Sequence, residues 1–126
     1  MMTRRTYRLG DLQLRIMRVL WDSAPASVAE VHGRLGGELA YTTIATMLRK
    51  MEDRGLLRHD EEGRKFVYRP AVSEEDVTRS MADDFVDRLF EGNLAETVSH
   101  LLQTREVSHK ELDRLERLIK ERKKRC

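Results

Sequence analysis

The spacing of apolar residues changes at Gly55, and this change constrains the fold more than any other feature of the sequence. Before Gly55, apolar side chains recur every three or four residues, the period of an amphipathic helix. After it, residues 56–70 are typical of two short strands around the turn "DEEG", with Pro70 ending the second strand. Three helices followed by a β-hairpin is the order of elements in a winged helix-turn-helix.

Start and stop signals delimit the three expected helices. The first helix ends before Pro25 and has an apolar face made of Leu9, Leu12, Ile16, Val19 and Leu20. The second begins with the capping-box pattern of Ser27 and Glu30, and the glycine pair at 36–37 ends it. The third is expected over about residues 42–54, with Gly55 as its C-terminal cap.

The chain is expected to become helical again after Pro70, in three segments with narrow apolar stripes. The roughly 54 residues of this region would bury too little apolar surface to be secure alone. Two packed copies would cover large side chains such as Phe85, Leu89 and Phe90, whereas folding back onto the N-terminal half would give a monomer. We expect a homodimer, because a symmetric DNA site favours a two-fold symmetric reader.

The predicted fold is therefore mostly α-helical with a small β-hairpin. We expect a winged helix-turn-helix DNA-binding domain over residues 1–72. Residues 73–126 are expected to form a three-helix dimerisation domain.

Charge differs between the two parts, although the whole chain carries a formal charge of only +2. Residues 1–72 contain 13 lysines and arginines against 9 acidic residues, whereas residues 73–126 contain 11 against 13. A basic N-terminal part fits a polyanionic partner; scatter in a charge-rich chain is the alternative interpretation.

The cellular location follows from three features of the sequence. Cys126 is the only cysteine, so no disulfide can form within the chain. No apolar run reaches the roughly 18 residues of a membrane span, and the basic N-terminus lacks the apolar core of a signal peptide. We expect a cytoplasmic protein without membrane insertion.

The exposed face of the third helix is the candidate binding surface. At about 100° per residue, Ile44, Met47, Leu48 and Met51 share one face, and the opposite face carries threonines and Arg49. Small side chains let a helix sit deep in a major groove, and arginine can donate two hydrogen bonds to guanine. An ordinary solvated face is the alternative. The predicted DNA-binding residues of this helix are Tyr41, Thr42, Thr43, Thr46, Arg49 and Lys50.

The hairpin adds a second, weaker candidate contact. Arg58, Arg64 and Lys65 are placed to meet phosphates beside the groove. The acidic residues 60–62, at the expected tip, argue against deep insertion, so we expect one or two phosphate contacts and no base reading. An acidic tip also favours the alternative function, a winged-helix module that binds a partner protein.

No group of residues supports catalysis or a cofactor. No glycine-rich phosphate loop exists, and the methionines fall at core spacing. The four histidines form neither an HExxH pair nor a triad spacing; they are His32, His59, His100 and His109. A small hydrolase is therefore the third and weakest hypothesis, and we expect no enzyme and no metal site.

Residues 9–80 resemble the penicillinase-repressor group (BlaI/MecI/CopY) of winged-helix transcription factors. The most specific segments are "VLW", "YTTIATML", "RGLL" and "FVYRP", and a looser likeness continues in register to the end of the chain. The resemblance implies a homodimeric transcriptional repressor that binds a palindromic, double-stranded DNA operator through the third helix and dimerises through the C-terminal helices. By position, it implies backbone contacts from Tyr41 and Lys50, and base reading by Thr42, Thr43, Thr46 and Arg49.

Regulation transfers less directly from the resemblance. Members that respond to β-lactams are inactivated when a membrane sensor protease cuts an Asn–Phe bond, so the resemblance implies such a protease as a partner. This chain has no Asn–Phe pair, and His100–Leu101 stands at the corresponding place. Copper-responsive members carry paired cysteines near the C-terminus, whereas Cys126 stands alone here, so we do not expect copper sensing.

Overall fold

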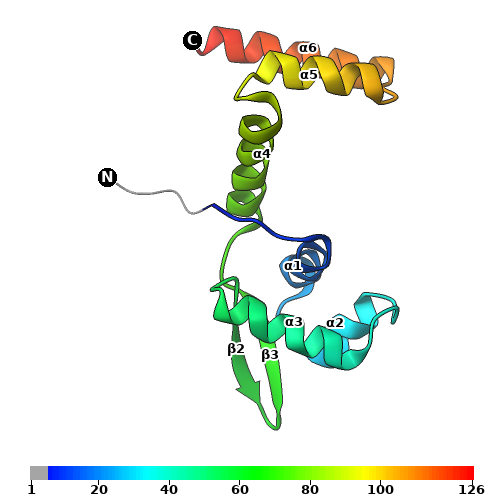
Figure 1. The fold of residues 1–126 in the computed structure, drawn as a ribbon, viewed down its shortest axis with the longest axis vertical. Helices are drawn as coiled ribbons and strands as arrows, with labels where there is room; N and C mark the ends of the chain where they lie inside the picture. The colour runs from blue at the N-terminus through cyan, green and yellow to red at the C-terminus, as the bar shows by residue number, and fades with distance from the viewer. Residues whose placement is uncertain (1–5) are drawn as a thin grey trace. The chain divides into compact units, whose positions relative to one another are not determined.

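The computed structural model describes residues 6–126, shown as a ribbon in Figure 1. Residues 1–5 of the predicted DNA-binding domain lie outside this range. The chain forms two compact units, of which the first ends at Asp84 and the second spans Phe85–Cys126.

Three helices build the core of the first unit: α1 (Asp11–Ser23), α2 (Val28–Arg34) and α3 (Tyr41–Asp53). The three predicted helices are thus confirmed, and α3 begins and ends one residue earlier than expected. Burying each large apolar side chain contributes about 1.5–3 kcal/mol. The largest fully buried side chains of these helices are Ile16, Met17, Leu20, Val31, Ile44, Leu48 and Met51.

Local capping fixes the ends of α2 and α3 as the sequence predicted. Ser27 Oγ accepts from the Glu30 backbone N–H at 3.2 Å, and Glu30 Oε1 accepts from the Ser27 N–H at 3.1 Å. Hydrogen bonding to the Glu30 carboxyl by the Ser27 backbone N–H, and next by the Ser27 side chain, lowers the pKa of that carboxyl. Gly55 takes a φ of 80° after α3, and its N–H donates to the Glu52 carbonyl at 2.9 Å.

The sheet has three antiparallel strands in the order β1–β3–β2. They are β1 (Ala26–Ser27), β2 (Leu57–Glu62) and β3 (Lys65–Pro70). The sequence predicted β2 and β3 but not β1. In β1, Ala26 pairs with Tyr68, so the short strand attaches the α1–α2 junction to the hairpin.

The hairpin turn differs from the prediction. Glu62 pairs with Lys65, so the connecting residues are Gly63 and Arg64 and not the whole "DEEG" segment. Gly63 supplies the positive φ, 63°, that a two-residue turn of this kind requires, which lets the strands stay paired up to Glu62. Residues 60–62 therefore belong to β2, with Glu62 directly beside the turn, and Arg64 stands in the turn itself.

The helix α4 (Glu74–Phe90) begins in the first unit, to which its residues up to Asp84 belong. Val77 is buried in the core. The Tyr7 backbone N–H donates to Ser80 Oγ at 2.8 Å, and Arg8 lies 3.8 Å from the Asp84 carboxylate. These contacts attach the start of α4 to the chain segment before α1.

The second unit contains the end of α4, α5 (Leu94–Thr104) and α6 (His109–Lys124), which confirms the predicted C-terminal helices. α5 and α6 run antiparallel (Figure 1). Asn93 Oδ1 caps α5 by accepting from the Glu96 N–H at 2.9 Å. Between α4 and α5, Glu91 and Gly92 both have positive φ, 51° and 80°, which turns the chain sharply.

Residues 85–126, all of which the structure describes, bury almost nothing within one copy of the chain. Thr97 is the only buried residue among them, and its hydroxyl donates to the Asn93 carbonyl at 2.9 Å. None of the helices in residues 6–126 combines the length and the apolar character needed to cross a bilayer.

Candidate nucleic-acid interface

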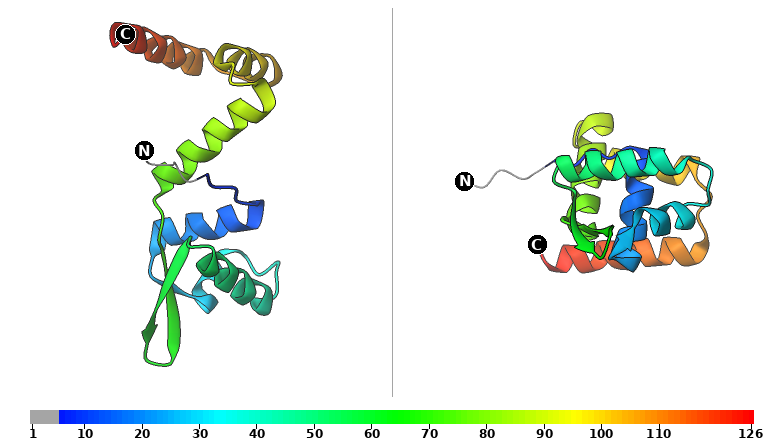
Figure 2. Two further views of the ribbon diagram at one scale, coloured as in Figure 1. Left: turned by 60° about the vertical axis from the view of Figure 1, so that its left-hand side comes forward. Right: turned by 90° about the horizontal axis from the view of Figure 1, so that it is seen from below.

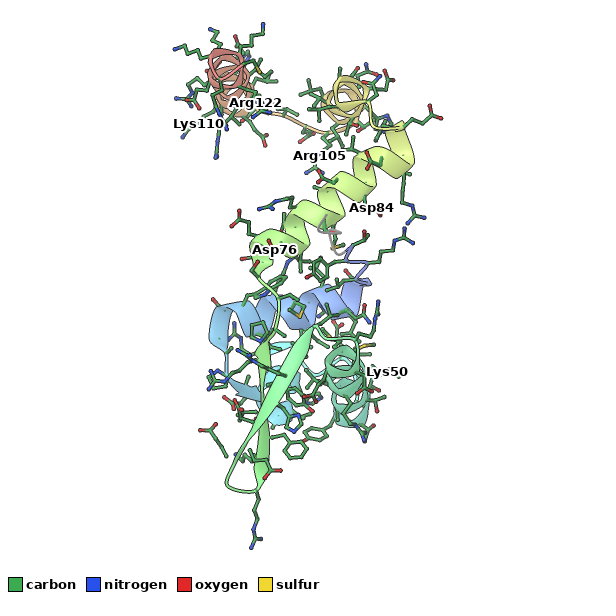
Figure 3. The ribbon with its side chains drawn as sticks, turned by 90° about the vertical axis from the view of Figure 1, so that its left-hand side faces the viewer. Lys50, Asp76, Asp84, Arg105, Lys110 and Arg122 are labelled. Carbon is green, nitrogen blue, oxygen red and sulfur yellow. The ribbon has the colours of Figure 1, made fainter. Side chains whose placement is uncertain are left out.

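The two faces of α3 have opposite roles. Ile44, Leu48 and Met51 are fully buried against the core. All six predicted DNA-binding residues of the helix lie on the exposed side, where Tyr41 is 50% exposed. Figure 3 shows Lys50 on the outer side of α3. The structure therefore brings Tyr41, Thr42, Thr43, Thr46, Arg49 and Lys50 together on one accessible surface.

This surface is shallowly hollowed. A groove of about 290 Å³ is lined by Thr42, Thr43, Thr46, Met47 and Lys50. Small hydroxyl-bearing side chains keep the backbone of α3 close to whatever lies against it, and each hydroxyl can donate or accept a hydrogen bond. Such a surface suits the base edges and methyl groups of a major groove.

The turn between α2 and α3 sets the direction in which α3 runs. Gly36 and Gly37 have φ of 84° and 74°, so the chain reverses tightly after α2. His32 Nε2 lies 2.8 Å from the Leu39 carbonyl oxygen, and its ring meets that of Tyr41 edge-on with centroids 5.9 Å apart. His32 thus holds the residues at which α3 begins.

The N-terminus of α3 is open to an anion. Its N-cap is Ala40, which has no side-chain capping bond, and its first turn contains no acidic residue. By contrast, α2 and α6 are capped by Ser27 and Ser108. Uncapped backbone N–H groups and the positive end of the helix dipole favour phosphate at such a position.

Arg49 lies near the base of the hairpin. Burial raises the pKa of the Tyr68 phenol, and the nearby Glu52 carboxylate raises it further, while Arg49 acts in the opposite direction. Tyr68 is 2% exposed, so its phenol senses these two neighbours in a setting with little water. Arg49 is exposed, which leaves its guanidinium accessible to a ligand.

The predicted hairpin residues form a separate part of the surface. Arg64 and Lys65 are exposed at the tip and at the start of β3, and Arg58 is exposed on β2. Figure 2 shows the hairpin projecting beyond the helices of the first unit, beside α3. Asp60 is paired with Arg69 at 3.0 Å, which offsets one of the acidic charges along β2.

Sequence reasoning missed a pair of residues that joins α3 to the hairpin. Glu52 of α3 receives hydrogen bonds from both the backbone and the ring of His59 in β2. The two residues are seven positions apart across a junction between helix and strand, where no periodic pattern relates them. The carboxylate–histidine pairing could only be found once the helix and the strand were placed.

The structure also bears on metal binding. Within residues 6–126, no three His, Cys, Asp or Glu side chains gather in a way that could hold a metal ion. The Cys126 thiol is free and exposed.

Comparison with known proteins adds three findings. Residues 9–121 match the family model for the penicillinase repressor. The penicillinase repressor of Bacillus licheniformis is 31% identical over 120 residues, covering 94% of each chain. The transcriptional regulator BlaI of Mycobacterium tuberculosis is 29% identical over 118 residues, covering 90% of this chain and 84% of the relative.

A solved structure matches the first part of the chain. It is the solution structure of the monomeric form of Bacillus licheniformis BlaI in complex with the blaP half-operator, with 33% sequence identity and a TM-score of 0.50. The match covers 59% of this chain and 93% of that one.

Proposed function

Because this chain belongs to the penicillinase repressor family, we propose that it is a homodimeric transcriptional repressor that binds a palindromic operator through α3. The family consists of transcriptional repressors and is not an enzyme class. The observation that carries the proposal is the exposed face of α3, which presents six polar side chains and begins at an uncapped helix N-terminus, and on which Thr42, Thr43, Thr46 and Lys50 line a shallow groove together with Met47. The matching BlaI structure contains a half-operator, which supports the same ligand here.

The residues divide by role in this proposal. Thr42, Thr43, Thr46 and Arg49 read base edges in the major groove. Tyr41 and Lys50 bind the phosphate backbone, as do Arg64 and Lys65 at the hairpin. Arg64 in the turn and Lys65 beside it support the phosphate role of the hairpin. The acidic residues that favoured the alternative function, a protein-binding module, lie along β2 up to the turn.

In this proposal, residues 73–126 form the dimerisation domain and residues 1–72 form the DNA-binding domain. The support is the apolar surface that residues 85–126 leave uncovered, in which Leu89 and Leu94 are each 65% exposed. Large apolar side chains left exposed in such number support an interface with another chain. A second copy would cover it and set the two α3 helices to meet two half-sites. The exposed apolar residues of this unit are Phe85, Leu89, Leu94, Val98, Leu101, Leu102, Leu112, Leu118 and Ile119.

A membrane sensor protease is a further partner in this proposal, and the repressor itself acts in the cytoplasm where its operator lies. The bond that corresponds to the cleaved one, His100–Leu101, lies inside α5, whose middle is exposed. Treating cells with a β-lactam and measuring the chain length by immunoblot tests this partner. Two fragments divided near residue 100 would support it, and an intact chain during induction of the controlled genes would contradict it.

A gel-shift titration tests the repressor proposal. The duplexes are the region upstream of the chain's own gene and a random sequence of equal length, each measured at several salt concentrations. The proposal predicts preference for the upstream region, and an observed binding constant that falls steeply with salt as counterions are released. No preference over random DNA, or a binding constant that does not vary with salt, would contradict it.

A further inference from the structure

The Glu52 carboxylate makes several contacts with one residue of the hairpin. Glu52 Oε2 accepts from the backbone N–H of His59 at 3.1 Å and lies 2.6 Å from its ring Nδ1, while Oε1 lies 2.8 Å from the same nitrogen. The His59 ring also lies near two aromatic rings. Its centroid lies 4.4 Å from that of Phe66 and 5.9 Å from that of Tyr68. The ring is therefore held between α3 and β3.

His59 stands at the point where the hairpin leaves the body of the first unit. It pairs with Tyr68, which is 2% exposed and belongs to the core. Beyond this pair, every residue from 60 to 66 is exposed. A two-stranded hairpin is only marginally stable by itself. Its direction is consequently set at its base, where Glu52 holds His59 on β2 and β1 pairs with Tyr68 and Val67 on β3.

We propose that Glu52 is a positioning residue for DNA binding, which fixes the hairpin against α3 through His59 so that Arg64 reaches a phosphate while α3 occupies the groove. The inference rests on the proposed function. Arg64 stands in the turn that follows residues 60–62 of β2, about four residue steps beyond His59 along the hairpin, or roughly 13 Å at about 3.3 Å per residue. A small rotation at the base therefore displaces the tip by several times the movement at His59.

A purely electrostatic effect and a positioning role predict opposite changes in DNA affinity when the Glu52 side chain is removed. Removing a negative charge close to Arg49 should strengthen binding to a polyanion if charge were all that mattered. If Glu52 positions the hairpin, its removal should weaken binding despite the more favourable net charge. Glu61 provides a matched control, because it is an exposed carboxylate of β2 paired across the hairpin with Phe66.

The test is a double-mutant cycle on the full-length protein. The probe is the duplex that the wild-type chain enriches most strongly from a random-sequence library. Glu52→Ala and Arg64→Ala should each reduce the slope of the logarithm of the binding constant against the logarithm of salt concentration by about the value of one phosphate contact. The dissociation constant of the double variant should equal that of Arg64→Ala within about twofold. Glu61→Ala should bind as tightly as wild type or more tightly. Losses that multiply in the double variant, or equal behaviour of Glu52→Ala and Glu61→Ala, would overturn the inference.

Glu52→Gln guards against a trivial loss of folding. In the wild type, Oε2 is within reach of both the His59 N–H and its ring nitrogen, so an amide oxygen at that position can accept both bonds. Glu52→Gln should therefore keep the wild-type salt slope, whereas a slope equal to that of Glu52→Ala would show that the hydrogen bonds are not what matters.

Amide hydrogen exchange on the free protein separates this inference from the proposed function, because it requires no DNA. Glu52→Ala should speed exchange in residues 59–67 by at least about tenfold and leave the buried turns of α1 unchanged. Unchanged exchange in the hairpin would overturn the positioning role even if the protein binds its operator. Failure of the wild type to enrich any duplex would instead refute the proposed function, and the DNA role of Glu52 with it.

Discussion

The indole Nε1–H of Trp21 donates a 3.0 Å hydrogen bond to the backbone carbonyl of Val72. This bond joins the last turn of α1 to the segment that leads from the hairpin into α4. Both side chains pack against the core without being fully buried. The bond thus fixes where the winged-helix fold passes into the C-terminal helices.

Replacing Trp21 with Phe tests this junction. The variant keeps an aromatic ring against the core but removes the N–H donor, and the Val72 carbonyl loses its partner. We expect the free energy of unfolding to fall by about 1–2 kcal/mol, measured by urea denaturation. A variant as stable as wild type would show that water replaces the indole without cost.

Ser27→Ala tests the capping of α2. The Ser27 hydroxyl is buried and accepts a hydrogen bond from the Glu30 N–H, one of the free N–H groups in the first turn of the helix. Its loss should cost about 1 kcal/mol of stability, again measured by urea denaturation. Ser99→Ala is the matched control, because Ser99 is exposed on α5 and accepts a hydrogen bond from Gln103 at the surface. Equal effects of the two substitutions would argue against a specific role for the cap.

The raised pKa of the Tyr68 phenol leads us to expect a loss of folding stability at alkaline pH. Burial, followed by the Glu52 carboxylate, raises the pKa of its phenol above the ordinary value. The neutral phenol is therefore favoured in the folded state. Its contribution is fully present below the unfolded pKa of about 10 and is lost as the pH rises through the folded pKa.

Tyr68→Phe should flatten this alkaline dependence, whatever its effect at neutral pH. The measurement is the free energy of unfolding by urea at a series of pH values from neutral to alkaline. Tyr41→Phe, at an exposed phenol, is the control and should keep the wild-type dependence. Parallel curves for wild type and Tyr68→Phe would contradict the assignment.

Leu89→Lys tests dimerisation. Leu89 is 65% exposed within one chain, yet an interface would bury it, so a charge there should be costly only in the dimer. Sedimentation should show the wild type as a dimer and the variant shifted toward monomer at the same concentration. Gln103→Lys places the same charge on an exposed polar position of α5 and should remain dimeric if that position lies outside the interface. A monomeric wild type would refute the proposal directly.

Most of the helices and strands could be predicted from apolar periodicity and from capping residues in the sequence. Ser27 with Glu30, and Gly55 after α3, are local signals, and the structure forms the bonds that those residue types predict. The apolar stripe of α3 predicted which face of the helix is buried, and the remaining residues therefore predicted its exposed face. These features depend on residues within a few positions of one another, which is why a sequence reveals them.

The features that sequence reasoning missed depend on pairing between distant segments. β1 has two residues, too few to show any period, and exists only because β3 lies beside it. The acidic residues before Gly63 are typical of a turn, but the strand register carries them into β2. Glu52 and His59 meet only after α3 and β2 are packed together.

The central claim is that the exposed face of α3 reads base pairs, and Arg49 tests it most directly. The measurement is the binding of wild type, Arg49→Ala and Lys50→Ala to a panel of operator duplexes, each carrying one base-pair change. Arg49→Ala should lose roughly 1–3 kcal/mol of discrimination at one base-pair position and keep it elsewhere. Lys50→Ala should weaken binding about equally on every duplex. An equal loss on all duplexes for Arg49→Ala, or no loss at all, would contradict the claim.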